Sequence, residues 1–400
     1  MALPKSSETK KVNLDFNKEF INTFTQNIER GNVEFVNQTL KDLHEADVAN
    51  LIENLTSDTR TKLIEIESFN IDPEIFIELN ESIQSEVLQL LSIESLIKII
   101  KRLESDNAIK ILENLSKETK EKVLEKLPPK DKFLLQEGLS YPEDSAARIM
   151  QREFTAVPSN WTVGQTIDYL REDKDLPEEF LEIFIVDNDF KPIGTVPSSR
   201  VLRTSRDLKM SSIMREMPVL ISVNMDKEEV GLTFENYNLV SAGVVNKENK
   251  LVGMITADDV VTVVQEEAEE DALRLAGVGD EEITDSVMLK TKRRFNWLLL
   301  NLFTALLATW VISFFGASIE QMVALAFLMP IVASMGGNAG MQTLAVTIRA
   351  IATKELSKSN FNRVVGKEFL IGILNGIIFA IITAIIVQFW FKELNLSLLI

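Results

Sequence analysis

Long uncharged apolar runs dominate the last quarter of the 400-residue chain. Three of them, residues 297–316, 322–348 and 369–391, are each long enough to cross a hydrocarbon layer of about 30 Å as a helix. Core helices of soluble proteins are rarely so long or so free of charge. Trp297 and Trp390 lie near the ends of two runs, where membrane helices often carry aromatic residues. The pattern therefore predicts three transmembrane helices.

The positive charges beside these runs predict their orientation. Arg293 and Arg294 directly precede the first run, whereas the loop after that run has neither Lys nor Arg. Five such residues lie in the segment 349–368, between the second and third runs. By the positive-inside rule, residues 1–294 and 349–368 lie in the cytoplasm. We expect a multi-pass protein of the cell membrane, with a transmembrane domain over 293–400 and no signal peptide.

The second apolar run contains residues that disfavour helix. Pro330 removes a helix hydrogen bond, and three glycines lower the helix propensity further. Broken backbone at this depth is tolerated only where it is buried in protein or lines a water-filled cavity, where freed carbonyls face a hydrated cation. Gly336 and Gly340 also form a helix-packing pattern, and the two interpretations are compatible. We expect the pore to be lined by Pro330, Gly336, Gly337, Asn338, Gly340 and Gln342.

Residues 1–140 are charged and carry apolar residues at helical spacing. The sequences LHEADVANLIENL at 43–55 and LESDNAIKILENL at 103–115 match at an offset of 60 positions. Repeated helix pairs favour a stacked superhelix. We therefore predict a superhelical N domain over this part of the chain.

Between residues 141 and 265 the pattern changes to short strands mixed with helices. The segments 186–194 and 245–253 are similar, and each predicts two strands joined by a polar turn and followed by a helix. The dipeptide Ile-Met opens each copy. This resembles a tandem pair of CBS domains, at about 146–207 and 208–265, and the resemblance implies a module that pairs with a second copy.

One motif in this module suggests nucleotide binding. In the CBS family, Thr/Ser-x-x-Asp after the glycine strand holds phosphate and ribose, and Thr256 and Asp259 match it. The first copy has Arg200 or Val201 where the acid would fall. ATP is therefore a candidate cofactor at one half-site. The simpler interpretation is that Thr256 caps a helix whose first turn contains Asp259.

Composition restricts the chemistry. The chain has no Cys and one His, His44, so disulfides, thiolate nucleophiles and multi-histidine metal sites are excluded. Any metal site must use oxygen ligands, which suit Mg, Ca or Mn. The net charge of the chain is −18. Residues 293–400 contribute +4, so residues 1–292 contribute −22. This charge argues against nucleic acid as a partner and fits either a solvated or a cation-collecting surface.

An acidic connecting region, 266–292, follows the CBS pair. If the helix that begins near residue 256 continues, Asp259, Glu266, Glu267 and Glu270 lie on one stripe. Like charges on one helical face repel, and a divalent cation would relieve that repulsion. An ordinary solvated helix face is the alternative.

The order of these features resembles the MgtE family of magnesium transporters along nearly the whole chain. The sequence GGNAGMQ at 336–342 is the most specific element, and YPED at 141–144 with the first Ile-Met supports it. The resemblance implies a mainly α multidomain membrane protein, with an α-superhelical N domain, an α/β tandem CBS module and an α-helical transmembrane domain. It implies a homodimeric Mg²⁺ channel that closes when Mg²⁺ binds between its cytoplasmic parts, with residues 267–290 as an amphipathic plug helix.

Motif matches carry regulatory cation ligands of the family onto this chain. The expected ligands are Asp259, Glu267, Glu270, Asp271, Glu228, Asp106 and Glu104. Two departures stand out: Asn238 replaces an acid that the family can have, and the family has five spans with a pore aspartate on the last. Residues 396–400 resemble the start of a fourth span, so we expect a chain that is truncated before that aspartate.

The resemblance therefore implies Mg²⁺ uptake across the cytoplasmic membrane, controlled by Mg²⁺ binding between acidic cytoplasmic regions. Its partners would be a second copy, membrane lipid and Mg²⁺, with no nucleic acid. The alternatives are a nucleotide- or cation-sensing CBS membrane regulator and a transporter of another divalent cation such as Co²⁺. An enzyme is not expected, because no nucleophile–base set or phosphate-cradling loop is evident.

Overall fold

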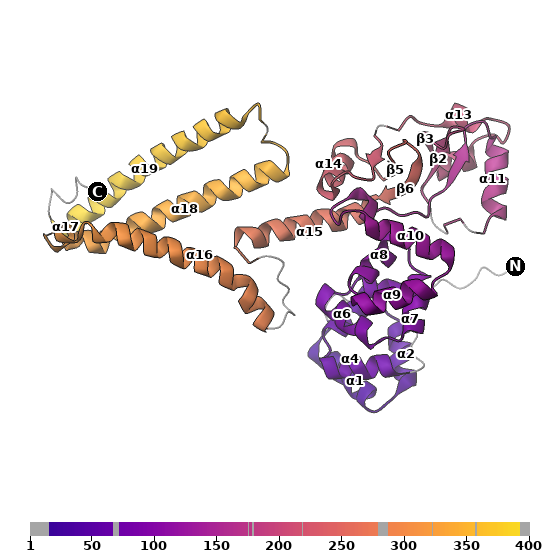
Figure 1. The fold of residues 1–400 in the computed structure, drawn as a ribbon, viewed down its shortest axis with the longest axis horizontal. Coiled ribbons are helices and arrows are strands. Elements are labelled where there is room, and N and C mark those ends of the chain that lie inside the picture. The colour runs from indigo at the N-terminus through magenta and orange to yellow at the C-terminus, as the bar shows by residue number, and fades with distance from the viewer. Residues whose placement is uncertain are drawn as a thin grey trace. The chain divides into compact units, whose positions relative to one another are not determined.

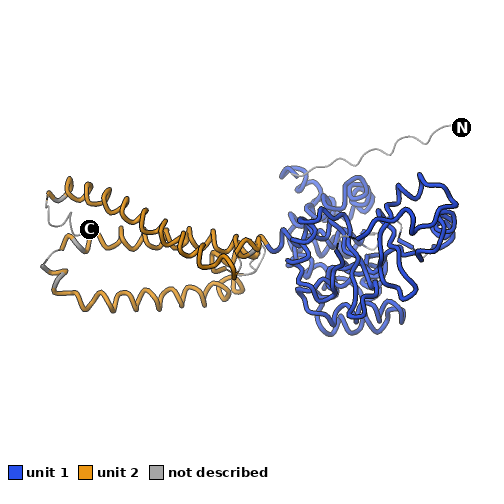
Figure 2. The backbone as a smooth tube through the Cα atoms, turned by 90° about the horizontal axis from the view of Figure 1, so that it is seen from above, with its two compact units in different colours: residues 1–267, 282–285 blue, residues 268–281, 286–400 orange. Residues whose placement is uncertain are grey.

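The computed structural model describes residues 16–66, 72–174, 176–177, 180–217, 219–278, 287–321, 323–356 and 358–392. The chain divides into two compact units, residues 1–267 with 282–285 and residues 268–281 with 286–400 (Figure 2). In the described part of the first unit, ten helices precede two three-stranded sheets (Figure 1).

Helices α1 to α10 pack around one apolar core. Phe24, Leu51, Phe76 and Leu112 are among its side chains, each with at most 1% exposure. This arrangement confirms the predicted helical N domain. The helices span Lys18–Glu29 (α1), Val33–Lys41 (α2), Glu45–Glu53 (α3), Ser57–Glu65 (α4), Pro73–Ile77 (α5), Glu81–Leu90 (α6), Ile93–Ile100 (α7), Ser105–Glu113 (α8), Lys117–Lys126 (α9) and Pro129–Ser140 (α10).

The helix pairs α3–α4 and α8–α9 correspond to the repeat predicted from the sequence. Their second helices begin in the same way: Thr56 accepts a hydrogen bond from the Thr59 amide, and Ser116 accepts one from the Thr119 amide. Such side chains satisfy amides that the first helical turn leaves without partners. The same local signals therefore produce the same helix–turn–helix unit twice.

An ion pair joins α4 to α6. Arg60 Nη2 lies 2.7 Å from Glu86 Oε2, and Arg60 Nη1 donates to the Leu55 carbonyl oxygen at 2.6 Å. Burial alone would raise the pKa of Glu86. Hydrogen bonds from Arg60 and Ser57 outweigh burial and hold the pKa of Glu86 below 4.5.

We expect Glu86→Gln to lower the free energy of unfolding by about 1 kcal/mol at neutral pH. Because the folded-state pKa is depressed, this contribution is present above the unfolded value of 4.5 and is lost as the pH falls through the folded value. Urea unfolding of both proteins at neutral and at acidic pH measures the difference. A difference that persists unchanged into strong acid would contradict the assignment.

The two sheets have the same topology, which confirms the predicted tandem CBS fold. In each sheet the first strand pairs in parallel with the second, and the second pairs antiparallel with the third. A register shift recurs at equivalent places, beside Val186 and Val245. The strands span Ala156–Pro158 (β1), Glu182–Val186 (β2), Pro192–Pro197 (β3), Ile221–Ser222 (β4), Ser241–Val245 (β5) and Leu251–Thr256 (β6). Their helices span Ala146–Arg148 (η1), Val163–Glu172 (α11), Ser198–Arg203 (α12), Met210–Ile213 (α13), Lys227–Tyr237 (α14) and Ala257–Leu275 (α15).

The segment that opens each copy packs on the sheet of the other copy. Gln151 forms a bridge with Met254 of the second sheet, and Arg215 forms one with Thr195 of the first. Met150 belongs to the core of the second copy. The Ile-Met dipeptides therefore join the two copies, whereas the sequence repeat suggested that each dipeptide belongs to the copy that it opens.

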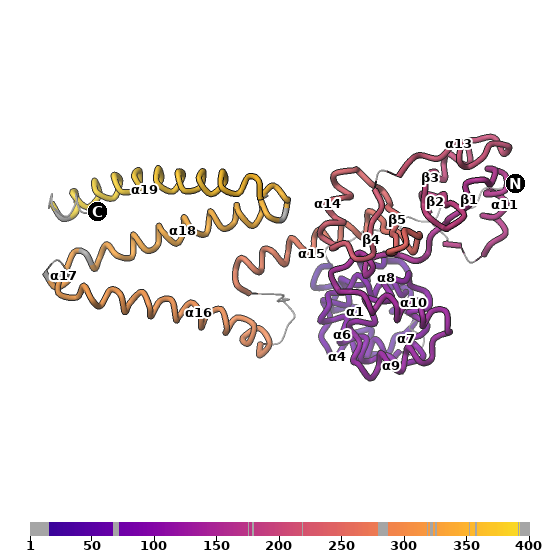
Figure 3. The backbone as a smooth tube through the Cα atoms, turned by 45° about the horizontal axis from the view of Figure 1, so that its top comes forward, coloured from indigo at the N-terminus to yellow at the C-terminus, as the bar shows by residue number. Residues whose placement is uncertain are grey.

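The second unit contains the long apolar helices Val287–Ser313 (α16), Ala324–Ala352 (α18) and Phe361–Phe391 (α19), with the short helix Gly316–Gln321 (α17). Helices α18 and α19 form an antiparallel hairpin (Figure 3). Among the described residues, α16 and α19 are long and apolar enough to cross a membrane, and at most 6% of their apolar windows is buried. Soluble proteins bury such helices, so this exposure supports two of the three predicted spans. The span at α18 stays a prediction.

The prediction of a broken second span is wrong for the helix itself. Helix α18 continues through Pro330, Gly336, Gly337 and Gly340 for 29 residues. Each glycine lowers helix propensity by only about 1 kcal/mol, which the hydrogen bonds of a long helix outweigh. The glycine carbonyls therefore lie within a continuous helix, and they are not freed by a break.

The prediction of one helix over residues 267–290 is also wrong. Helix α15 ends at Leu275, and α16 begins at Val287. Gly277 has a left-handed φ of +69°, and the amides of Gly277 and Val278 donate to the carbonyls of Arg274 and Leu273. This pattern ends helices, because glycine adopts the left-handed conformation without steric cost.

Candidate functional site

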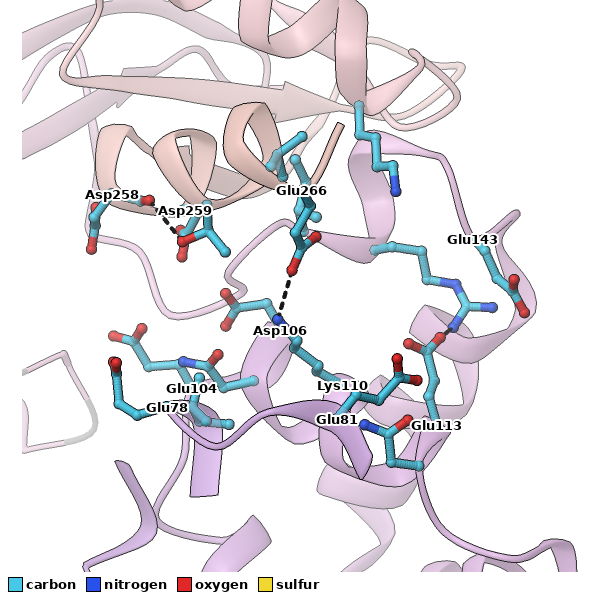
Figure 4. Close-up of a pocket in the computed structure, with 18 of the residues that line it drawn as sticks. Glu78, Glu81, Glu104, Asp106, Lys110, Glu113, Glu143, Asp258, Asp259 and Glu266 are labelled. Carbon is cyan, nitrogen blue, oxygen red and sulfur yellow. Dashed lines mark hydrogen bonds and ion pairs between the residues drawn. The ribbon is translucent and has the colours of Figure 1, made fainter. Parts of the chain in front are cut away.

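A cavity of about 650 Å³ lies in the first unit, between helices α5, α6 and α8 on one side and the first turns of α15 on the other (Figure 4). Eleven acidic residues line it, against three basic ones. The acids are Glu74, Glu78, Glu81, Glu104, Asp106, Glu113, Glu143, Asp144, Asp258, Asp259 and Glu266. The basic residues are Lys110, Arg148 and Lys227. Such a cavity favours cations.

The N-terminus of α8 positions two of the expected ligands. Glu104 is its N-cap residue, and Asp106 lies in its first turn, where the helix dipole favours acids. The carboxylate of Glu153 accepts hydrogen bonds from the Ser105 amide at 3.2 Å and the Ser105 hydroxyl at 2.8 Å. Glu153 thereby satisfies amides at the helix start and fixes α8 against the segment that opens the CBS module.

The first turn of α15 positions Asp259. The hydroxyl of Thr256, the residue before the helix, donates to Asp259 Oδ2 at 2.6 Å. Gln151 Nε2 donates to Asp259 Oδ2 at 3.1 Å and to Glu104 Oε2 at 2.8 Å. One side-chain amide therefore connects carboxylates from the N domain and the CBS module.

The carboxylates at the centre of the cavity resist ionisation. Burial, followed by repulsion from Asp259 and Glu153, raises the pKa of Glu104 to about 7. Burial and then Asp259 raise the pKa of Asp106 well above its usual range. Burial also raises the pKa of Asp259, although the Thr256 hydrogen bond opposes the shift. A nearby cation would stabilise the ionised form of each of these groups.

Asp106 carries a second sign of an incomplete site. Its side chain is 8% exposed, and its Oδ1 atom is buried without a hydrogen-bond partner among the described residues. A buried acceptor without a partner costs free energy, so such an atom in a native site is satisfied by a water or an ion. The nearest acidic neighbours of Asp106 include Asp259 and Glu104.

These residues fit a hydrated Mg²⁺ better than a fully protein-bound ion. Among the described residues, no three acidic or His side chains converge closely enough to hold a metal together. Mg²⁺ dehydrates reluctantly and is usually held through one or two carboxylates while it keeps several waters. Asp106 and Asp259 supply such carboxylates, and the cavity has room for the waters.

The other expected ligands are more dispersed. Helix α15 is continuous through Glu266, Glu267 and Glu270, but each of these carboxylates has a basic partner: Lys110, Lys227 and Arg274 respectively. These ion pairs relieve the repulsion that we expected along the stripe. Glu270 and Asp271 belong to the second unit. Glu228 lies in the first turn of α14 and outside the cavity lining.

Sequence reasoning missed two lysines that line the cavity and a glutamine that donates hydrogen bonds to two of its carboxylates. Lys110 lies one turn after Asp106 on α8, a spacing that places both on one helix face. Lys227 precedes Glu228 directly, and Gln151 follows the first Ile-Met dipeptide. Only the Lys110 spacing was a usable signal. The polar side chains Asn338 and Gln342 of the expected pore lie exposed on α18, so they remain predicted pore residues.

Comparison with known families and proteins gives consistent matches. The family model described as the MgtE intracellular N domain matches residues 43–144. The CBS domain model matches residues 146–207 and 210–266, and the model described as divalent cation transporter matches residues 329–400.

Three curated relatives are named magnesium transporter MgtE. The Bacillus subtilis protein is 31% identical over 253 residues, which is 63% of this chain and 56% of the relative. The Enterococcus faecalis protein is 29% identical over 66% of this chain and 59% of the relative. The Thermus thermophilus protein is 30% identical over 59% of this chain and 53% of the relative. The chain thus spans 53 to 59% of the length of these relatives.

Two solved structures share the fold of the first unit. The soluble part of a magnesium transporter aligns with a TM-score of 0.54 at 22% identity, over 63% of this chain and 99% of that one. The cytosolic domain of the Mg²⁺ channel MgtE in complex with ATP also aligns with a TM-score of 0.54, at 23% identity over 61% of this chain and 99% of that one.

Proposed function

Because the chain belongs to the MgtE family of divalent cation transporters, we propose that it serves Mg²⁺ uptake across a cell membrane. We further propose that Mg²⁺ binding in the acidic cavity holds the N domain and the CBS module together and thereby closes the pathway. The observation that carries this proposal is Asp106, a buried carboxylate whose Oδ1 has no hydrogen-bond partner among the described residues and whose acidic neighbours include Asp259 of the CBS module.

The cavity residues would act by charge balance. A bound Mg²⁺ supplies two positive charges and ordered waters. Asp106 and Glu104 approach from α8, and Asp259 approaches from α15. Without a cation, ionisation of these groups would place like charges together across the domain boundary, and a bound cation would be held by them jointly. The docked arrangement is favoured only because it binds the cation more tightly than the separated arrangement does.

Two arginines at the domain boundary report docking. The side chains of Arg148 and Arg152 are 11% and 9% exposed, and they pair with Glu113 and Glu137 of the N domain. An arginine-specific protease therefore cleaves after them only when the N domain separates. We expect Mg²⁺ to slow this cleavage in the full chain, roughly tenfold at saturation, because bound ligand shifts the population toward the docked state.

Variants test the assignment. Asp259→Asn should remove most of the Mg²⁺ effect, whereas Asp207→Asn, an exposed acid outside the cavity lining, should leave it intact. Mg²⁺ protection of Asp259→Asn equal to that of the unchanged protein would refute the cavity as the sensing site.

We propose a homodimer as the working assembly. Apolar side chains that remain exposed support it: Val261 and Val264 on α15, and Tyr237 and Val240 at the end of α14, each with more than half of its area exposed. Light scattering of the detergent-solubilised chain should give the mass of two copies. A monomer at micromolar concentration would contradict the proposal.

Nucleotide binding at Thr256 and Asp259 stays a separate prediction, and one of the solved structures with the same fold is a cytosolic domain in complex with ATP. In this chain the Thr256 hydroxyl is satisfied by Asp259, and the surrounding cavity is acidic, which disfavours phosphate. We therefore favour the cation. Calorimetry with ATP, with and without Asp259→Ala, separates the two ligands.

A further inference from the structure

Two lysines bridge the parts of the cavity that Mg²⁺ is proposed to join. Lys110 Nζ on α8 lies 3.0 Å from Glu266 Oε1 on α15, so it links the N domain directly to the CBS helix (Figure 4). Lys227 Nζ on α14 lies 3.2 Å from Glu267 Oε1 and 3.3 Å from Asp144 Oδ1, in the segment that connects the N domain to the CBS module. Both lysines thus place an ammonium group where carboxylates of different elements converge.

From this arrangement we propose that Lys110 and Lys227 are tethered counter-ions that keep the N domain docked when no metal is bound. The proposal rests on the proposed function, because it concerns the metal-free state of the same cavity. The proposal implies that part of the protein is docked even without Mg²⁺. The lysines determine this docked fraction, and Mg²⁺ binding can increase it only by the remainder.

The ion pairs of the two lysines are expected to differ in strength. The Lys110 and Glu266 side chains are 44% and 49% exposed, so solvent screens their attraction. Lys227 is 20% exposed and has two acidic partners. Its backbone is fixed as well, because the Lys227 amide donates to the Asp144 carbonyl oxygen at 2.8 Å. The Lys227 ammonium group is therefore held in a defined position, whereas the Lys110 ion pair is more exposed and joins the N domain to α15.

Removing these ammonium groups acts mainly on the metal-free protein. Without them, Glu266 and Glu267 add to the uncompensated charge that already surrounds Asp106 and Asp259, and docking weakens. When Mg²⁺ is bound, the cation itself supplies positive charge, so docking depends less on the lysines. The ratio of cleavage rates without and with Mg²⁺ should therefore rise in the variants.

The experiment measures cleavage after Arg148 and Arg152 in the full chain, with an arginine-specific protease and a chelator present. Lys110→Gln should speed metal-free cleavage about two- to fivefold, as expected for loss of an exposed ion pair. Lys110→Gln with Lys227→Gln should speed it roughly tenfold, because the two pairs are separate. Saturating Mg²⁺ should return both variants close to the unchanged protein.

Two further variants control for charge and folding. Lys122→Gln removes the same charge from an exposed pair within α9, Lys122 with Glu118, and should change nothing. The exchange Lys110→Glu with Glu266→Lys rebuilds the pair in reverse and should restore slow metal-free cleavage. This exchange keeps the proposal falsifiable if the double glutamine variant folds poorly.

Metal-free cleavage of the double variant at the rate of the unchanged protein would overturn the tethered counter-ion proposal. So would failure of the exchange variant to restore slow cleavage. These outcomes are independent of the proposed function, which fails instead if Mg²⁺ protects neither the unchanged protein nor the lysine variants.

Discussion

Replacing Asp106 by Asn should stabilise the metal-free protein and abolish its stabilisation by Mg²⁺. The amide has nearly the same shape as the carboxyl group but no charge, and it removes repulsion with Asp259 and Glu104 in a buried place. A gain of about 1–2 kcal/mol is expected, or roughly 2–8 °C in the melting temperature of a unit of this size. Most substitutions at buried sites destabilise, so the sign is the distinctive part of this prediction.

The stability that Asp106→Asn adds to the metal-free protein should depend on pH. Since burial raises the folded-state pKa values of Asp106 and Glu104, the unchanged protein is most stable when both are protonated and loses stability as the pH rises toward the Glu104 value of about 7. Asp106→Asn should flatten this decline. Thermal melts across this range, with a chelator and then with Mg²⁺, measure both effects. An Asn variant that is less stable at neutral pH, or that keeps its Mg²⁺ shift, would contradict the account.

Leu112→Ala should cause the largest loss of stability among the changes considered. Leu112 is fully buried in the N-domain core and lies on α8, the helix that carries Asp106 and Lys110. Truncation removes buried methyl groups and leaves a cavity, which typically costs about 2–5 kcal/mol. Urea unfolding followed by circular dichroism measures the change.

A matched control exists on α6. Leu90 is 39% exposed, so Leu90→Ala should cost less than about 1 kcal/mol. If the two alanine variants were equally stable, the assignment of α8 to the centre of the core would be wrong. If Leu112→Ala also raised metal-free cleavage after Arg148, the packing of α8 would be linked directly to docking.

Local patterns in the sequence predicted the N domain and the CBS pair well. The sixty-residue repeat and the two similar strand pairs were visible in the sequence, and each corresponds to the expected elements. Helix α15 continues from Ala257 to Leu275, so the condition under which Asp259, Glu266, Glu267 and Glu270 share one stripe is met. Asp106, Glu104 and Asp259 were chosen as ligands and do meet at one cavity.

The remaining features depend on distant contacts or on competing local preferences. Lys110 and Glu266 are far apart in sequence, so neither indicates that the other neutralises it. Gln151 connects two carboxylates only because its segment packs on the second sheet. In α18 the glycines and Pro330 disfavour helix, yet the apolar length of the segment prevails. Gly277 was a readable stop signal, and its left-handed φ ends the helix that we expected to continue.

The central claim is that a cation in the acidic cavity holds the N domain against the CBS module. The most direct test is the distance between Lys117 on α9 and Lys247 in the β5–β6 turn, both exposed, measured by electron spin resonance between labels on introduced cysteines. The chain has no Cys of its own, so only these sites are labelled. The account predicts one narrow distance distribution with Mg²⁺ and a broader, longer one with a chelator, with Asp106→Asn narrow in both conditions. The same distribution with and without Mg²⁺ in both the unchanged protein and the Lys110→Gln, Lys227→Gln variant would contradict it.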